Sequence, residues 1–505
     1  MRELLLGIDI GTSACKAAVF GEDGEVVAQT AAEYPVSYPR PGWAEQDPEL
    51  WWQAVCVALR RLTGSGAFDP SEVAGVGVDG QSWSAIAIGR EGRVLCPTPI
   101  WMDTRAGDVC AAMRETVGED RLFAVSGNPL SPSYTMPKVL WYKEHCPEVY
   151  EKAGKILQSN SFIAFRLTGE VSQDPSQGYG WACWDMARGA WDEDLCRELG
   201  VRTSLLPPVA ACSEVVGRVT EEAARLTGLP EGTPVVAGGL DAACGTLGAG
   251  VLHPGQTQEQ GGQAGGMSIC MDVCRADRRL ILGAHVVPGL WLLQGGTVGG
   301  GGALNWFKRE FGAAERDAAA RTGGSTFAEM DREAGNVPPG SEGLVFLPYL
   351  AGERSPIWDV HAKGVYYGVT FAKTRAHFAR ACMEGVAYSL RHNLETAREA
   401  GAEAGVLRAM GGAANSRLWT QIKADVTGCR IEVPGSDTAT SLGAALLAGV
   451  GTGVYRNFDE AAERTIRIRR TVEPNPETAR AYEKGYRTYR RLYEKLKDLM
   501  KEEDQ

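Results

Sequence analysis

The 505-residue sequence lacks any run of 18 apolar residues, so it predicts no transmembrane helix. Its first residues predict no signal peptide, because Asp9 interrupts an apolar stretch that is too short for one. It also lacks an excess of positive charge. The 52 Lys and Arg residues face 63 Asp and Glu residues, and the net charge of −11 argues against nucleic acids and membranes as partners. We therefore expect a cytoplasmic protein.

Missing motifs argue against a zinc site and against a P-loop nucleotide site. The 13 cysteines contain no C-x-x-C pair, which favours reduced thiols and argues against a zinc site. No G-x-x-x-x-G-K-[ST] motif is present, which excludes a P-loop NTPase. Residues 75–80 do match G-x-G-x-x-G, but the residues after them favour a strand rather than the helix that a dinucleotide site needs.

Glycine, in contrast, is abundant. The sequence has 63 glycines in 505 residues, against an average near 7%. Three clusters lie in the second half, at Gly261–Gly266, at Gly295–Gly302 with Thr297, and at Gly411-Gly412 with Asn415. Each cluster could be an ordinary loop. Three of them together favour backbone that lies against a flat anionic ligand such as a nucleotide.

Hydrophobic patterning predicts an α/β protein with two similar halves. Apolar segments separated by turn residues indicate strands at 4–10, 15–20, 26–33 and 73–78, and 3.6-residue spacing indicates helices at 49–62, 303–311, 377–397 and 418–427. Asp47 followed by Pro48 is typical of a helix start. The tyrosine stripe of residues 476–501 favours a last helix that packs on its own domain.

Two acids follow predicted strands. Asp9 precedes Gly11-Thr12-Ser13, where a carboxylate can hold a hydrated divalent cation and the turn can face phosphate oxygens; an ordinary hairpin is the alternative. Asp241 follows an apolar strand and two glycines. It is either a helix N-cap or a general base at a strand end, and the two roles are compatible.

An ordered set of motifs resembles the FGGY carbohydrate kinases from about residue 4 to about residue 450. The motifs are Asp9-Ile10-Gly11-Thr12-Ser13, Trp101-x-Asp103-x-Arg105, Lys138-Val139-Leu140-Trp141, Gly239-x-Asp241, Gly364-Val365-Tyr366-Tyr367-Gly368-Val369, His377-x(6)-Glu384-Gly385 and Gly411-Gly412-x-x-Asn415. Residues 45–52 and 346–356 are similar to the xylulokinase-like branch.

The resemblance implies two actin-like, ribonuclease H-like domains of the sugar kinase/Hsp70/actin superfamily with a central cleft. Residues 1–240 would form the sugar-binding domain and residues 241–505 the ATP-binding domain. Asp241 would contact the sugar and take its hydroxyl proton as the general base, and Asp9 and Asp241 would hold Mg²⁺. The other implied site residues are Gln81, Ser82, Trp83 and Asp103 for the sugar, and Gly11, Thr12, Ser13, Lys16, Gly262, Gln263, Gly299, Gly300, Gly411, Gly412 and Asn415 for ATP.

The implied activity is ATP-dependent phosphorylation of a hydroxyl on a small sugar, a ketose such as xylulose or a related polyol. The alternative is a nucleotide- or sugar-binding regulatory protein on the same fold. Xylulokinases usually carry Gln-Met-His-Gly where this chain has Gln81-Ser82-Trp83-Ser84, which predicts a pocket of different selectivity because sugars stack on indoles. A small-molecule sugar is the expected partner, and the oligomeric state, a homodimer included, stays open.

Overall fold

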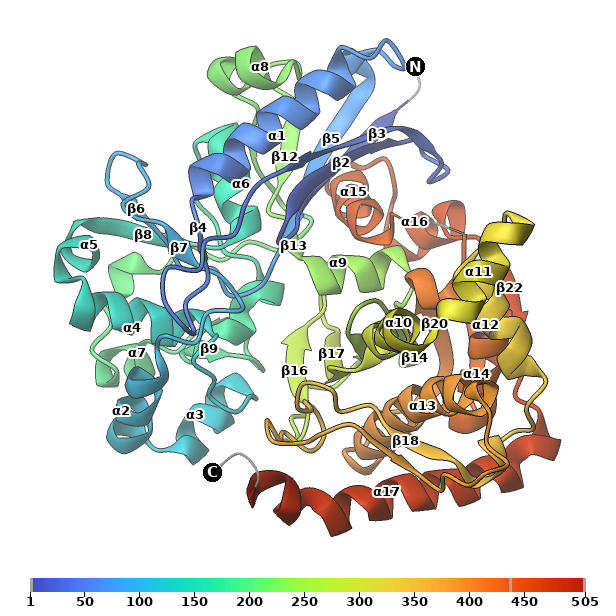
Figure 1. Ribbon diagram of the computed structural model, residues 1–505. Coiled ribbons are helices and arrows are strands. Elements are labelled where there is room, and N and C mark those ends of the chain that lie inside the picture. Colours follow the sequence, from blue (N-terminus) through green and yellow to red (C-terminus); the bar gives the residue numbers. More distant parts are fainter. Residues whose placement is uncertain (1–2, 436–437, 503–505) are drawn as a thin grey trace. The chain divides into compact units, whose positions relative to one another are not determined.

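The computed structural model describes residues 3–435 and 438–502. The chain folds into two compact units (Figure 1). Unit 1 comprises residues 1–252, 272–292 and 438–466, and unit 2 comprises residues 253–271, 293–437 and 467–505. The domain boundary expected between residues 240 and 241 stays a prediction, and these units divide the chain at other places.

The sheet of unit 1 has the strand order β11-β12-β5-β1-β2-β3, with β13 beside the end of β5. Its strands are β1 Leu4–Ile10, β2 Ala14–Phe20, β3 Val26–Glu33, β5 Val73–Gly80, β11 Val215–Arg218, β12 Pro234–Val236 and β13 Gly239–Leu240. Strand β1 runs antiparallel to β2 and parallel to β5. The first three predicted strands are confirmed to within one residue at each end.

Helices cover this sheet, and one of them comes from far along the chain. Helix α1 (Pro48–Thr63) packs on β2 and β3, and Asp47 caps it by accepting from the N–H of Glu49, as predicted. Helix α15 (Ala439–Thr452) packs on β1, β5 and α9 (Asp241–Gly248) (Figure 1). The other helices of unit 1 are α2 Gly107–Val117, α3 Glu119–Ser126, α4 Thr135–His145, α5 Pro147–Lys152, α6 Ser159–Thr168, α7 Glu193–Glu198, α8 Glu221–Thr227 and α16 Phe458–Thr465.

Glycine allows the unusually close approach of α15 to the sheet. A Cβ atom on Gly7 would lie 1.9 Å from the carbonyl oxygen of Ser441, and one on Gly77 would lie 1.9 Å from that of Ala444. Because backbone cannot yield as a flexible side chain does, larger residues at these two positions would push the helix away from the strands. Part of the glycine excess therefore serves packing rather than ligand binding.

The strands of unit 2 follow the order β17-β15-β14-β20-β21-β22. They are β14 Gly255–Gly261, β15 Gly265–Met271, β17 Trp291–Thr297, β20 Ala404–Met410, β21 Arg430–Pro434 and β22 Ile468–Val472. The helices are α10 Gly300–Phe311, α11 Ala313–Thr322, α12 Thr326–Gly335, α13 Arg375–Glu399, α14 Arg417–Thr427 and α17 Ala479–Glu502. The predicted helices at 303–311, 377–397 and 418–427 are thus confirmed.

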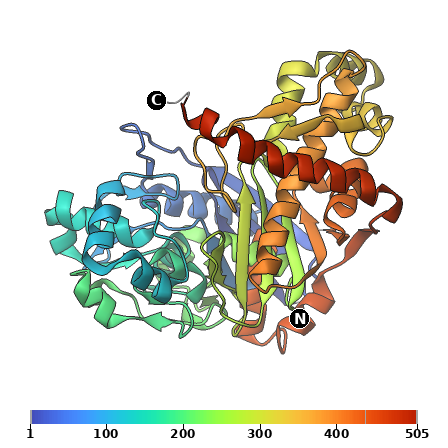
Figure 2. The same ribbon diagram turned by 90° about the horizontal axis from the view of Figure 1, so that it is seen from below.

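The last helix packs on its own unit, as its tyrosine stripe predicts. Tyr482, Tyr486 and Tyr489 of α17 are buried in the same apolar core as α13. The hydroxyl of Tyr349 donates to that of Tyr489 at 2.6 Å. Helices α13 and α17 contact each other, and Figure 2 shows α17 in red. Among the residues described, none of the helices has both the length and the apolar character that crossing a membrane requires.

Candidate active site

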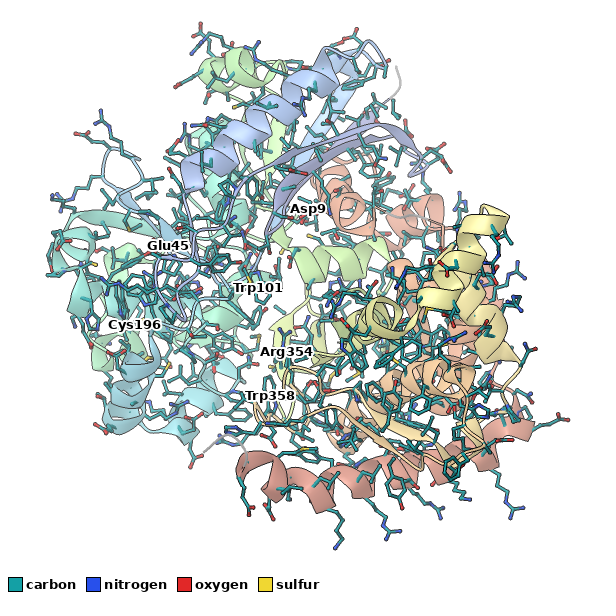
Figure 3. All side chains as sticks on the ribbon, viewed as in Figure 1. Asp9, Glu45, Trp101, Cys196, Arg354 and Trp358 are labelled. Carbon is teal, nitrogen blue, oxygen red and sulfur yellow. The ribbon has the colours of Figure 1, made fainter. Side chains whose placement is uncertain are left out.

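Three acids meet at one edge of the sheet of unit 1. Asp9 near the end of β1 is the register partner of Asp79 in the parallel strand β5, and Asp79 is the register partner of Gly239 in β13. Asp241 follows Gly239 by two residues. Because the three strands run parallel, their carboxyl ends bring Asp9, Asp79 and Asp241 together (Figure 3 labels Asp9). Asp9 and Asp241 both belong to unit 1, whereas the predicted boundary between residues 240 and 241 puts them in different domains.

Burial raises the pKa values of all three acids. Asp79 is fully buried, and neither of its carboxyl oxygens has a hydrogen-bond donor in the structure as described. Burial, with the nearby charges of Asp9 and Asp241, raises the pKa of Asp79 well above its usual range. Burial and then Asp9 raise the pKa of Asp241 to about 7. Burial also raises the pKa of Asp9, against the effect of Lys16, whose Nζ lies 3.9 Å from Asp9 Oδ2.

Asp241 begins helix α9 as its first residue. Leu240 occupies the N-cap position, so the N-cap alternative for Asp241 is wrong. The Asp241 carboxylate accepts a hydrogen bond from the N–H of Ala242 at 2.6 Å. The side chain thus lies at a strand-to-helix junction beside two other acids, and this position suits a general base.

The predicted phosphate-binding residues lie on the β1–β2 turn and the start of β2. The Thr12 hydroxyl accepts from the indole N–H of Trp101 at 2.9 Å, and the Thr12 carbonyl accepts from Gln46 Nε2 at 2.8 Å (Figure 3 labels Trp101). The N–H of Gly11 donates to the carbonyl of Ala14 at 3.1 Å. Ser13 and Lys16 are exposed, so their side chains are accessible to a ligand.

The predicted sugar-binding residues 81–83 form the turn that follows β5. The N–H of Gln81 donates to the carbonyl of Ile10, and its Nε2 donates to Gln46 Oε1, both at 2.9 Å. Its Oε1 is buried and has no donor among the described groups. Ser82 is half-buried.

Trp83 holds an unusual backbone conformation. Its φ is +60°, which bulky residues rarely adopt and which often marks a functional turn. Its ring packs against those of Tyr134 and Tyr179, with centroids 4.7 and 5.4 Å away. The ammonium group of Lys138, fully buried, donates to the carbonyl oxygens of Trp83 at 2.9 Å and Ile100 at 2.7 Å.

Asp103, also predicted for the sugar, has protein partners for both oxygens. The guanidinium of Arg105 donates to both at 2.8–3.0 Å, and the N–H of Ala44 donates to Oδ2 at 2.7 Å. Arg105 also donates to Glu45 at 2.7 Å. The carboxylate is fully buried. Asp103 therefore connects the segments that contain Ala44 and Arg105. Its contact with sugar stays a prediction.

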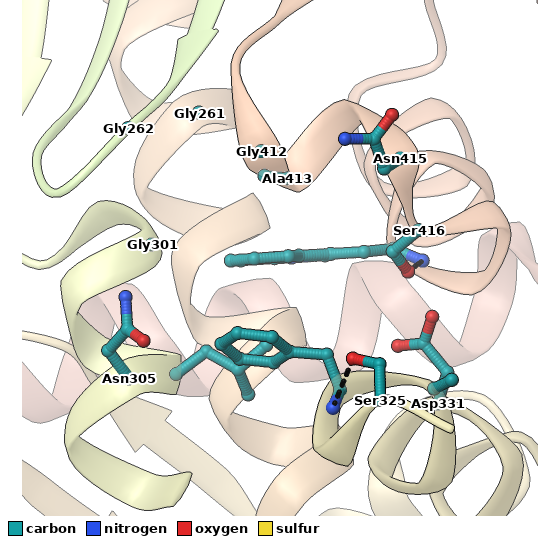
Figure 4. A pocket seen from close by; sticks show the side chains of 14 residues that line it. Gly261, Gly262, Gly301, Asn305, Ser325, Asp331, Gly412, Ala413, Asn415 and Ser416 are labelled. Atoms are coloured by element: carbon teal, nitrogen blue, oxygen red, sulfur yellow. Dashed lines mark hydrogen bonds between the residues drawn. The ribbon is translucent and has the colours of Figure 1, made fainter. Parts of the chain in front are cut away.

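Unit 2 holds a cavity of about 490 Å³ with an apolar lining and a polar rim. Figure 4 shows Asn305, Ser325, Asp331 and Asn415 around it. The lining residues are Gly261, Gly262, Gly301, Leu304, Asn305, Ser325, Phe327, Ala328, Asp331, Gly412, Ala413, Asn415, Ser416 and Trp419. Gly262, Gly412 and Asn415 of the predicted ATP set are thus brought together at one cavity.

The other predicted ATP residues of unit 2 do not line this cavity. A Cβ on Gly299 would lie 2.0 Å from the carbonyl oxygen of Pro348, and one on Gly300 would lie 2.1 Å from the nitrogen of Gly265. These two glycines thus allow the start of α10 to pack closely. Gly411 has a φ of +80°, which favours glycine, and Gln263 is exposed.

The sequence alone did not single out several of these groups. Asp79 lies in residues 75–80, whose pattern matches only the glycines of a dinucleotide motif. Lys138 is part of a family-like motif but had no assigned role. Phe327, Asp331 and Trp419 line the cavity from helices α12 and α14, and only the fold brings them beside the glycines.

The chain matches the models of the FGGY family of carbohydrate kinases, the N-terminal domain at residues 4–248 and the C-terminal domain at residues 278–452. A xylulose kinase of Bacillus subtilis (strain 168) is 32% identical over 500 residues, which are 98% of this chain and 97% of that protein. The crystal structure of xylulose kinase from Rhodospirillum rubrum has a TM-score of 0.90 and 31% identity, and covers 99% of this chain and 100% of that one. That of gluconate kinase from Lactobacillus acidophilus has a TM-score of 0.89 and 25% identity, and covers 98% of each chain.

The chain therefore belongs to the FGGY family of carbohydrate kinases. It is a phosphotransferase that uses ATP to phosphorylate a hydroxyl of a small sugar. The predicted α/β fold of two sheet-based, actin-like domains is confirmed. The alternative of a regulatory protein without phosphoryl transfer finds no support in these relatives.

Proposed function

We propose that the protein phosphorylates an uncharged ketose or polyol, such as xylulose, and that Asp241 is the general base. The observation that carries this proposal is the position of Asp241 at the start of α9, beside Asp9 and Asp79 at the carboxyl ends of three parallel strands. A base has to lie at the reacting hydroxyl, and a pKa of about 7 suits proton transfer near neutral pH.

The charges around the predicted sugar pocket favour an acceptor without a carboxylate. Gln81, Ser82, Trp83 and Asp103 supply no positive charge. The two cations that contact them are committed elsewhere, since Lys138 donates to two backbone carbonyls and Arg105 to Asp103 and Glu45. A sugar acid would instead meet three acids at the strand ends, and its carboxylate would be repelled.

The same strand ends suit Mg²⁺. In the parts of the chain that the structure describes, no group of three His, Cys, Asp or Glu side chains is arranged to hold a metal by itself. This agrees with Mg²⁺, which proteins usually hold through one or two carboxylates together with waters and substrate phosphates. Asp9 and Asp241 are the residues that would hold it. Bound there, Mg²⁺ would neutralise phosphate charge, and Gly11, Thr12, Ser13 and Lys16 would contribute further donors.

For the nucleotide, the cavity of unit 2 supports a site for adenosine. Its volume of about 490 Å³ is in the range of small-molecule sites. Apolar side chains of Leu304, Phe327 and Trp419 line it, and Asn305 and Asn415 offer hydrogen bonds at its rim. Gly262 and Gly412 would leave backbone open to the ligand. This arrangement suits a flat base that is apolar on its faces and polar at its edges.

A screen for ADP release over C3–C7 ketoses, polyols and sugar acids tests the proposal. D-xylulose and D-gluconate at equal concentrations form the decisive pair. We expect turnover with neutral ketoses or polyols and at least about 100-fold lower kcat/KM with sugar acids, because a carboxylate that is desolvated beside other acids without a charge partner of its own is strongly disfavoured. Preference for gluconate would contradict the proposed substrate class.

A further inference from the structure

A further buried carboxylate, that of Asp174, lies close to the three acids in unit 1. Asp174 in unit 1 immediately precedes the short helix η2 (Pro175–Gly180) and is 1% exposed. It accepts hydrogen bonds from Ser176 Oγ at 2.5 Å, from the N–H of Gln177 at 3.0 Å and from Asn160 Nδ2 at 3.0 Å. Burial raises the pKa of Asp174, and these donors oppose the rise. These donors, and the Cys212 thiol at 3.9 Å, are neutral groups, so the carboxylate depends on hydrogen bonds rather than on an ion pair.

Ser176 connects this carboxylate to the start of α9. Its hydroxyl donates to Asp174, so its lone pairs are free to accept, and it accepts from the N–H of Leu240 at 2.8 Å. Leu240 is the N-cap residue of α9 and directly precedes Asp241. A Cβ on Gly239 would lie 2.9 Å from Ser176 Oγ, so glycine at this position allows the approach. The orientation of the Asp241 backbone is thus linked to Asp174 through one hydroxyl.

The same network holds the end of β5. Gln177 Nε2 donates to the carbonyl oxygens of Gly80 at 3.2 Å and Gln81 at 3.3 Å. Asn160 Nδ2 donates to the carbonyl of Ala237 at 3.2 Å as well as to Asp174. The donors around Asp174 therefore bind two segments of backbone. One is the end of β5, just after Asp79, and the other is the segment that leads to Asp241.

We propose that Asp174 and Ser176 are positioning residues that set the distance and direction of the Asp241 carboxylate relative to Asp9 and Asp79. The inference rests on the proposed role of Asp241. It adds two residues whose side chains are buried, so their effect is expected through the backbone at Asp241. Because a displacement of about 1 Å at a reacting group costs about 100-fold in rate, loss of the Ser176 hydroxyl is expected to act mainly on kcat.

Ser176→Ala is the first test, with Ser172→Ala as its matched control. The Ser172 hydroxyl is also buried in this segment, but it has no hydrogen-bond partner in the described structure. We expect Ser176→Ala to lower kcat by about 10- to 100-fold while the KM values for sugar and ATP change less than about threefold. Ser172→Ala should keep kcat within about twofold. Equal kcat values for the two variants would overturn the inference.

A double-mutant cycle separates positioning from simple destabilisation. Asp241→Asn alone should lower kcat by about 10²–10⁴ if Asp241 is the base. Adding Ser176→Ala in that background should change kcat by less than about twofold, because the group being positioned is already lost. A further tenfold loss there would contradict positioning through Asp241. If Asp241→Asn stayed active, the proposed function itself would be wrong, and this result is distinct from the first.

Asp174→Asn provides a variant for the case in which Ser176→Ala does not fold. The substitution preserves the shape of the side chain. It replaces one carboxylate oxygen, which accepts hydrogen bonds in the wild type, with an amide NH₂ group, which cannot accept them. The same kcat loss with unchanged KM values is expected, and wild-type kcat would overturn the inference. Thermal unfolding of each variant, compared with Ser172→Ala, separates loss of fold from loss of rate.

Discussion

Asp9 and Asp79 are register partners on parallel strands, and Asp79 is fully buried, with no hydrogen-bond donor to either of its carboxyl oxygens in the described structure. Two carboxylates at this spacing cannot both ionise cheaply, so one of them retains a proton. Burial and the charges of Asp9 and Asp241 raise the pKa of Asp79 well above the usual range, so Asp79 is the member of the pair that we expect to retain the proton. Ionisation of Asp79 therefore destabilises the folded protein.

Asp79→Asn should stabilise the protein increasingly as the pH rises. The pKa of Asp79 is raised in the folded state, so the unfolded chain releases this proton first and the wild type loses stability as the pH rises above about 4. The amide removes that loss. Thermal unfolding at pH 5, 6.5 and 8 in buffer with a chelator checks this, and we expect the difference between variant and wild type to grow across the series.

Asp69→Asn serves as the control for this titration. Asp69 caps a short helix, and the N–H of Ser71 holds the pKa of Asp69 below its usual value. Because this pKa is lowered in the folded protein, Asp69 is already ionised in both the folded and the unfolded chain above the usual range of an Asp, so the difference between Asp69→Asn and wild type should stay constant from pH 5 to 8. A constant difference for Asp79→Asn as well would show that Asp79 is ionised in the folded protein.

The proposed base should give the activity an acid limb. Asp241 accepts a proton only as a carboxylate, and its pKa is raised to about 7. We expect kcat/KM to fall about tenfold per pH unit below an apparent pKa at or under about 7, since Mg²⁺ beside the carboxylate would favour its ionised form. The residual activity of Asp241→Asn should lack this limb. The same acid limb in that variant would assign the titration to another group.

Local pattern was sufficient for most elements of the fold. The apolar run at residues 4–10 and the segment 26–33 after its turn match β1 and β3, and Asp47 with Pro48 marks the start of α1. The resemblance to sugar kinases also supplied Asp9 and Asp241 as candidates, which the structure brings to one sheet edge. Such signals depend on neighbours along the chain, and the sequence displays them directly.

Long-range contacts were beyond the sequence. Helix α15 packs on β1, which lies more than 400 residues earlier, and Gly7 and Gly77 are needed for that contact rather than for a ligand. Asp79 can be identified as part of the site only from the strand register, which places it beside Asp9. The isolated sequence of residues 75–80 carried the glycines of a dinucleotide motif, and nothing local to it identified the acid as the informative residue.

Lys138 should maintain the sugar pocket through the backbone of Trp83. Lys138→Met keeps the length of the side chain but leaves the carbonyls of Trp83 and Ile100 without their donor. Since φ of Trp83 is +60°, we expect the turn to relax and KM for the sugar to rise at least about tenfold, while KM for ATP stays within about twofold. Initial rates at varied sugar and varied ATP measure both.

Lys143→Met is the matched control for this variant. Lys143 lies on the same helix α4, but it is an exposed lysine that donates to the carbonyl of Gly200 at 2.7 Å. Removing that surface donor should leave both KM values unchanged. If Lys143→Met raised KM for the sugar as much as Lys138→Met, the effect would come from helix α4 as a whole and not from the Trp83 turn.

Filling the cavity of unit 2 should weaken ATP binding alone. A Cβ on Gly412 would meet nothing within 4 Å, and Gly412 lines the cavity, so Gly412→Val adds volume there without an internal clash. We expect KM for ATP to rise about tenfold with KM for the sugar unchanged, because one or two lost contacts at a base are worth about 1–3 kcal/mol.

Gly405→Val is the control for this variant, because Gly405 also has no neighbours within 4 Å but lies outside the cavity. Calorimetric titration with ADP gives the affinities directly. Equal ADP affinity in both variants would place the nucleotide elsewhere, since a ligand in this cavity has to compete with the added side chain for space.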